Sequence, residues 1–256
     1  MSDPLALPLS HFFNAVGETI LQMMKNGYPL TIAALLENLL KEGASPKQLE
    51  RQEKKVADLF TCLIAQSTLS KTKTGKFSIV IFLEGLPGCG KSTLVAILNQ
   101  VFPDLVHINQ DALKAEAQAT KKKCRDYQDI LKAALKSGVR LIVIDRTNGA
   151  FTERHKNLIL CAGHLSMCVS FQDTMEDCIT QATKRCEGAC VEGLDVVPSS
   201  LEKENITKAL KILNGIRCPV LAQEGFEKVF DLSRQQEKES RDVVVGQIID
   251  FLHSLL

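Results

Sequence analysis

The sequence of 256 residues contains no tryptophan, and aromatic residues make up only 5% of it. Base stacking on aromatic side chains would therefore have few platforms in this protein. No run of 18 apolar residues occurs, so the sequence predicts no membrane-spanning helix. The 31 basic and 30 acidic residues leave a net charge of +1. This balance excludes a generally basic coat for nucleic acid but leaves room for a local basic groove.

The first residues, Met1 to Pro4, lack the positive start of a signal peptide. The nine cysteines are odd in number and scattered through apolar stretches, which is not the pattern of a disulfide scaffold. We therefore expect a reducing compartment, either cytoplasm or nucleus, and no membrane partner.

The chain divides by pattern into two parts. Residues 1–75 carry helical patterns only, and one of these helices begins at Ser45-Pro46, with proline at its first helical position. The stretch Lys71–Lys76 is polar and charged, as is typical of a linker. We expect a helical N-terminal appendage over residues 1–75 and a second domain over residues 76–256.

Short apolar runs alternate with helical stretches in the second part, and the tail after Gln235 has a helical pattern. This alternation predicts an α/β domain with a parallel sheet. The predicted strands are Phe77–Leu83, Leu105–Ile108, Val139–Ile144 and Leu165–Phe171.

A phosphate-loop motif follows the first of these strands. Residues 85–92 fit G-x-x-x-x-G-K-[ST] and are followed by Thr93 and a helical run. Backbone N–H groups in such a loop bind nucleotide phosphates, a lysine reaches the β- and γ-phosphates, and a hydroxyl ligates Mg²⁺. A glycine-rich turn without a ligand is the alternative, and the flanking strand and helix favour the nucleotide site. The predicted binding residues are Gly85, Leu86, Pro87, Gly88, Cys89, Gly90, Lys91, Ser92 and Thr93.

The second predicted strand ends in Asn109-Gln110-Asp111. The carboxyl ends of parallel strands meet at the edge where the phosphate loop lies, so Asp111 is placed to take a proton from an attacking hydroxyl. The alternative is an N-cap for a helix that begins at Ala112. Position alone does not separate these two interpretations.

The third predicted strand ends in Asp145-Arg146-Thr147-Asn148. An aspartate at this point is typical of a group that holds Mg²⁺, directly or through water, whereas a turn-forming residue is the alternative. Arg154 and Lys184-Arg185 supply cations that could close on a transferring phosphoryl group, although one such cation more often lies on a solvated surface.

These segments together resemble the 5′-OH polynucleotide kinase family, which includes the kinase domains of RNA and DNA end-repair enzymes. The resemblance runs from about Phe77 to Leu232 and consists of ordered matches. They are GLPGCGKST, HINQD, DRTN followed by Arg154, an apolar strand, a helix ending in Lys184-Arg185, Val197-Pro198, and Pro219 with Glu224-Gly225-Phe226.

The resemblance implies an adenylate-kinase-like core and roles for particular residues. Asp111 would be the general base, and Arg185 would be the lid arginine that clamps the donor phosphates. Lys91 and Ser92 would keep their phosphate-loop roles. Asp145 and Asn148 would line the site, and Arg154 would lie near a phosphate.

Two positions depart from the family pattern. Many members carry arginine before the catalytic aspartate, where this chain has Gln110, and Arg146 lies inside the D-x-T-N segment. We therefore expect the acceptor side to differ from that of a standard 5′-OH kinase. No phosphatase or ligase segment occurs, so residues 1–75 are candidates for contact with other end-processing domains or proteins.

The sequence thus predicts Mg²⁺-dependent transfer of the γ-phosphate of an NTP, either ATP or GTP, to the 5′-OH end of a polynucleotide, with RNA favoured over DNA. Three alternatives stay open: a kinase of 5′-monophosphate RNA ends, a kinase of small molecules or nucleotides, and a nucleotide-binding scaffold. The basic stretch Lys121–Arg125 would attract the phosphate backbone of a polynucleotide acceptor, and the alternative is a solvated helix face.

Overall fold

A computed structural model of the chain describes residues 7–67, 77–121, 124, 126–186, 205–233 and 238–256. Three helices come first: α1 (Leu9–Asn26), α2 (Ile32–Lys41) and α3 (Pro46–Ser67). Gly27 ends α1 in the left-handed conformation, and the Thr31 hydroxyl caps α2 by accepting from Ala34 N. The predicted linker Lys71–Lys76 lies outside the described residues.

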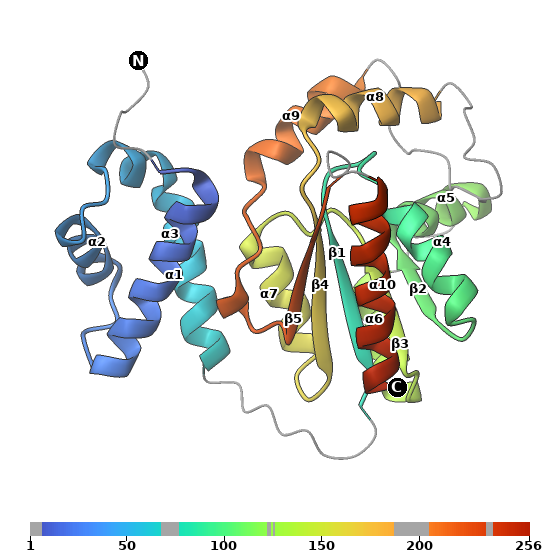
Figure 1. Ribbon diagram of the computed structural model, residues 1–256, viewed down its shortest axis with the longest axis horizontal. Helices are drawn as coiled ribbons and strands as arrows, with labels where there is room; N and C mark the ends of the chain where they lie inside the picture. Colours follow the sequence, from blue (N-terminus) through green and yellow to red (C-terminus); the bar gives the residue numbers. More distant parts are fainter. Residues whose placement is uncertain (1–6, 68–76, 122–123, 125, 187–204, 234–237) are drawn as a thin grey trace.

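In the described residues that follow, five parallel strands form one sheet, and helices flank it (Figure 1). The strands lie in the order β2-β3-β1-β4-β5. Every residue of β1, β3 and β4 is buried, which explains their continuous apolar sequences. The predicted α/β class with a parallel sheet is confirmed. The strands are β1 (Ile79–Glu84), β2 (Val106–Asn109), β3 (Leu141–Asp145), β4 (Leu165–Phe171) and β5 (Lys228–Leu232).

Helices cover both faces of this sheet. Alternate β1 residues point to opposite faces: Ile79, Ile81 and Leu83 pack against α4, α8, α9 and α10, whereas Val80 and Phe82 pack against α6 and α7. Within the described residues, no helix is long and apolar enough to cross a lipid bilayer. The helices and one 3₁₀ turn are α4 (Lys91–Val101), α5 (Gln110–Thr120), α6 (Tyr127–Ser137), α7 (Phe151–Leu160), α8 (Met175–Cys186), α9 (Ile206–Ile216), η2 (Ala222–Glu224) and α10 (Lys238–Leu255).

The N-terminal helices pack against one side of the sheet domain, beside α7 and η2 (Figure 1). Phe151, at the start of α7, belongs to the same buried cluster as the core of the three helices, as do Cys218 and Leu221. The rings of Phe13 and Phe151 meet edge to face, with their centroids 5.4 Å apart. The helical part of the chain therefore shares a core with the sheet domain.

Candidate active site

The phosphate loop connects β1 to α4 and needs glycine at two tight points. Gly85 has φ +154°, and a Cβ built there would lie 2.7 Å from Cys89 Sγ. Gly88 has φ +91°, and its Cβ would lie 2.5 Å from the Cys178 carbonyl oxygen of α8. Both distances are shorter than a side chain tolerates. Packing as well as backbone conformation therefore requires glycine at these two positions.

The Lys91 ammonium lies inside the curve of this loop. Its Nζ donates to the carbonyl oxygens of Gly85, at 2.8 Å, and of Leu86, at 2.9 Å. The side chain is buried at the first position of α4, and Ser92 and Thr93 follow it in the same helical turn, both half-buried. Residues 85–93 thus bring a cation, two hydroxyls and a helix N-terminus together.

The Cys89 side chain is buried in the same loop, with 1% exposure. Burial raises the pKa of the Cys89 thiol, and the nearby charge of Lys91 only partly opposes this effect. A buried neutral thiol reacts slowly with alkylating reagents and oxidants.

Asp145 ends β3 and lies opposite Asn109 of β2 in the register of the sheet. Asn109 Nδ2 donates to Asp145 Oδ2 at 2.8 Å, and His107 Nε2 lies 3.2 Å from the same oxygen. Burial alone raises the pKa of the Asp145 carboxyl. The hydrogen bonds from its two partners and the charge of Lys91 outweigh burial, so this pKa lies below its ordinary value.

The chemistry of this carboxylate fits Mg²⁺, which prefers oxygen ligands. Asp145 is ionised, and its contacts with Asn109 and His107 both end on Oδ2, which leaves Oδ1 to a metal or its water. Ser92 supplies a hydroxyl at the start of α4, on the face of the sheet to which Asp145 also points. Of these two predicted metal residues, Asp145 ends β3, and Ser92 follows the loop that leaves the neighbouring strand β1.

Asp111 lies in the first turn of α5, next to the tip of β2, with its side chain exposed. The helix begins at Gln110, and the Asn109 side chain caps it by accepting from Ala112 N at 2.9 Å. Asn109 is therefore the N-cap of α5, and the interpretation of Asp111 as the N-cap is wrong.

The two departures from the family pattern meet in the structure. Arg146 Nε donates to Gln110 Oε1 at 2.7 Å. The guanidinium carbon lies 4.0 Å from the centroid of the Tyr127 ring, and Nη2 lies 3.9 Å from Glu153 Oε1. A guanidinium therefore lies beside Gln110, the residue that precedes Asp111, although it belongs to the residue after β3 rather than to one after β2.

The structure contradicts the prediction that Arg154 lies near a phosphate. Its side chain is 0% exposed and forms a two-bond ion pair with Glu224, with Nε–Oε2 at 2.7 Å and Nη2–Oε1 at 2.8 Å. The remaining N–H groups donate to backbone carbonyls, so none is left for a phosphate. Arg154 is a buried structural residue that ties α7 to η2. The acceptors are the carbonyl oxygens of Asn148, Gly149, Cys218 and Pro219.

Asn148 is also buried and does not line the site as predicted. It has φ +44°, and its Nδ2 donates to the Leu83 carbonyl at 2.9 Å. Asn148 therefore joins the β3–α7 turn to the end of β1, below the phosphate loop. Its role is to hold these two strand ends together.

Arg185 lies in the last turn of α8 and is half-buried. It follows Cys178, which touches the loop at Gly88, by seven residues, or about 10 Å of helix. Residues 187–204, which include Val197-Pro198, lie outside the described part of the chain, as do Lys122, Lys123 and Arg125 of the basic stretch. The lid role of Arg185 stays a prediction.

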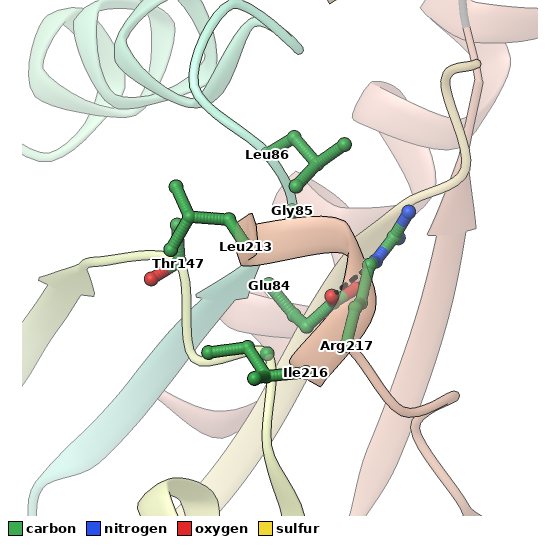
Figure 2. Close-up of a pocket in the computed structure, with 8 residues that line it drawn as sticks. Glu84, Gly85, Leu86, Thr147, Leu213, Ile216 and Arg217 are labelled. Atoms are coloured by element: carbon green, nitrogen blue, oxygen red, sulfur yellow. Dashed lines mark hydrogen bonds and ion pairs between the residues drawn. The ribbon is translucent and has the colours of Figure 1, made fainter. Parts of the chain in front are cut away.

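Sequence reasoning missed the pair formed by Glu84 and Arg217. Glu84 ends β1 and is buried next to the phosphate loop, and Arg217 follows α9. The two residues, together with Leu86, Thr147, Leu213 and Ile216, line a small pocket beside the loop (Figure 2). The signal for this pair was an acidic residue at the end of an otherwise apolar strand. Its partner, Arg217, lies too far along the chain to be identified from the sequence.

Residues 80–163 match the family of tRNA ligase kinase domains. The match spans β1, the phosphate loop, the tips of β2 and β3, and α7. It confirms the predicted resemblance to P-loop kinase domains of nucleic-acid end processing, and with it a phosphotransferase. A search of curated protein sequences finds no match.

Three solved structures that match this chain are distant from it in sequence. A fungal RNA kinase is 20% identical, with a TM-score of 0.49 over 70% of this chain and 86% of that chain. Kti12 of Chaetomium thermophilum, in complex with ADP-AlF3, is 16% identical, with a TM-score of 0.45 over 67% and 97%. A gluconokinase of Sinorhizobium meliloti 1021 is 12% identical, with a TM-score of 0.43 over 70% and 97%.

Proposed function

We propose that this protein transfers the γ-phosphate of an NTP to the 5′-OH end of a polynucleotide, with Mg²⁺ as cofactor and RNA as the favoured acceptor. One observation carries the proposal. The phosphate loop follows the end of β1, Asp145 is the last residue of β3, and Asp111 comes two residues after the end of β2. These three strands are neighbours in the sheet (Figure 1). A donor phosphate, a metal ligand and a general base can therefore meet there.

The donor side rests on residues 85–93. The loop N–H groups and the α4 N-terminus would bind the phosphates, and Lys91 would exchange the carbonyls of Gly85 and Leu86 for phosphate oxygens. Ser92 and Asp145 would hold Mg²⁺, which when bound neutralises charge on the β- and γ-phosphates. Arg185 would add a second cation from α8.

The acceptor side rests on Asp111 and Arg146. Asp111 is a carboxylate whose capping alternative is removed by Asn109, so a role in proton transfer explains its place. Arg146 places its guanidinium beside Gln110 and could bind a phosphodiester next to the reacting end. The match to tRNA ligase kinase domains supports RNA as the acceptor.

The test is incubation of the full chain with γ-labelled ATP or GTP, Mg²⁺ and a panel of acceptors. The panel holds 5′-OH RNA, 5′-OH DNA, 5′-phosphate RNA and mononucleotides. We expect label on 5′-OH RNA first and on 5′-OH DNA more weakly. Label on 5′-phosphate RNA or on mononucleotides alone would replace the proposal with the corresponding alternative, and bound NTP without transfer to any acceptor would favour a scaffold.

A further inference from the structure

An ion pair joins the end of β1 to the end of α9, directly behind the phosphate loop (Figure 2). Arg217 Nε donates to Glu84 Oε1 at 2.6 Å, and Arg217 Nη2 donates to Oε2 at 3.0 Å. Ser170 Oγ also donates to Glu84 Oε2, at 2.8 Å. Because a guanidinium fork fixes the orientation of a carboxylate as well as its distance, this pair holds the end of β1 in one place relative to α9.

The same guanidinium reaches the other neighbour of the loop. Arg217 Nη2 donates to the carbonyl oxygen of Phe171, at the end of β4. Phe171 bounds the loop, because a Cβ on Gly85 would lie 2.8 Å from Phe171 Cβ. Arg217 thus holds both Glu84, which precedes the first loop residue, and Phe171, which packs against it. The N–H of this first loop residue, Gly85, itself donates to the Thr147 carbonyl oxygen at 3.1 Å.

The N-terminal helices hold Arg217 in turn. Lys55, in the middle of α3, donates from Nζ to the Arg217 carbonyl oxygen at 2.9 Å. The next residue, Cys218, donates its N–H to the Gly149 carbonyl at 2.7 Å and is buried in the core of the helices. A chain of contacts therefore runs from α3 through Arg217 to the start of the phosphate loop.

We propose that Arg217 is a positioning residue of the nucleotide site and that Lys55 makes the N-terminal helices a support of that site. The proposal rests on the proposed nucleotide binding by residues 85–93. It assigns a role to the helical part of the chain: α3 fixes the segment after α9, and this segment fixes the loop through Glu84. Neither residue needs to touch the nucleotide.

Lys55 offers the milder test, because it lies outside the sheet domain. Lys55→Met keeps the apolar stem and removes the donor, so the dissociation constant for Mg²⁺ with ATP or GTP should rise, by no more than about fivefold, which is the worth of one hydrogen bond. Lys55→Arg, which restores a donor, should recover most of this affinity. The control is Lys54→Met, an exposed neighbour on the same helix, which should bind as the wild type does. Calorimetric titration gives the affinities.

The ion pair offers the sharper test. Arg217→Gln alone leaves a buried Glu84 carboxylate without its cation and should destabilise the fold. The double variant Glu84→Gln with Arg217→Gln removes both charges and should recover stability, yet bind nucleotide about tenfold or more weakly, because the fork that orients the loop is gone. Thermal unfolding and nucleotide titration of each variant separate the two effects.

The outcomes are distinct. A double variant that regains both stability and affinity would show that the pair only stabilises the fold and would overturn the proposal, as would Lys55→Met with unchanged affinity. If the double variant does not fold, the Lys55 series decides. A wild-type chain that binds neither ATP nor GTP would instead contradict the proposed function itself.

Discussion

Asp145 shows how one buried side chain keeps the charge that its proposed role needs. Burial opposes ionisation, but His107, Asn109 and Lys91 together favour it, so the pKa lies below the ordinary value near 3.8. A carboxyl whose pKa is lowered on folding stabilises the fold at pH above its unfolded value. That contribution is lost as the pH falls through the folded value.

The first prediction follows from this sign. Wild-type stability should decline as the pH drops below about 4, and Asp145→Asn should show a shallower decline there, because this variant has no carboxyl to protonate at that position. The measurement is the midpoint of thermal unfolding of both proteins from about pH 6 to about pH 3. An equally steep decline in Asp145→Asn would contradict the assignment.

Single residues also mark where sequence reasoning fails. The phosphate-loop residues were recognisable because their order and spacing are local. Arg154 was placed near a phosphate because its motif suggested it, but its charge is satisfied by Glu224, 70 residues away in sequence. Nothing local distinguishes a buried arginine with a distant partner from one that faces a ligand, because the partner is chosen by the fold.

The contact between the phosphate loop and α8 is the feature that matters at the scale of elements. Gly88 has φ +91° and lies against the α8 backbone, whereas Gly138 has φ +75° and has nothing within 4 Å of its would-be Cβ. These two glycines separate the cost of backbone strain from the cost of a steric clash.

The second prediction uses this matched pair. Gly138→Ala should cost about 1–2 kcal/mol through backbone strain alone and leave nucleotide binding unchanged. Gly88→Ala should cost more, because α8 must shift, and should weaken Mg²⁺–NTP binding. Urea unfolding and nucleotide titration of both variants measure the difference. Equal effects of the two substitutions on binding would contradict a role for the contact between Gly88 and α8 in nucleotide binding.

Element prediction found β1 to β4 and missed β5, one of the two edge strands of the sheet. The runs that became β1, β3 and β4 are continuously apolar, and each was predicted to within two residues at either end. β5 was missed because it has only five residues, with exposed Lys228 at its start and exposed Asp231 between its two buried residues. Its parallel partner β4, far away in sequence, supplies the stability that its own pattern does not reveal.

The shared core between helices α1–α3 and the sheet domain is the main feature of the whole molecule. The sequence predicted the helices and their separation from the second part by composition. It did not show where they pack, because the contacts of Phe13 with Phe151 and of Lys55 with Arg217 join distant segments.

The third prediction tests whether this shared core makes the helices and the sheet domain one cooperative unit. Phe13 is 0% exposed, and Phe13→Ala should lower the free energy of unfolding by about 3–5 kcal/mol and reduce hydrogen-exchange protection in β1 as well as in α1. The control is Leu21→Ala on the same helix, an exposed leucine whose loss should cost less than about 1 kcal/mol. Loss of protection confined to α1–α3 would contradict a cooperative unit.

The central claim is that Asp111 takes the proton from a 5′-hydroxyl while the phosphate loop holds the donor. The most direct measurement is the rate of transfer from γ-labelled NTP to a 5′-OH RNA oligonucleotide by wild type and Asp111→Ala, alongside nucleotide affinity. We predict a rate lower by about a hundredfold or more with affinity nearly unchanged, whereas Lys91→Ala should lose both. Full transfer activity in Asp111→Ala would contradict the account.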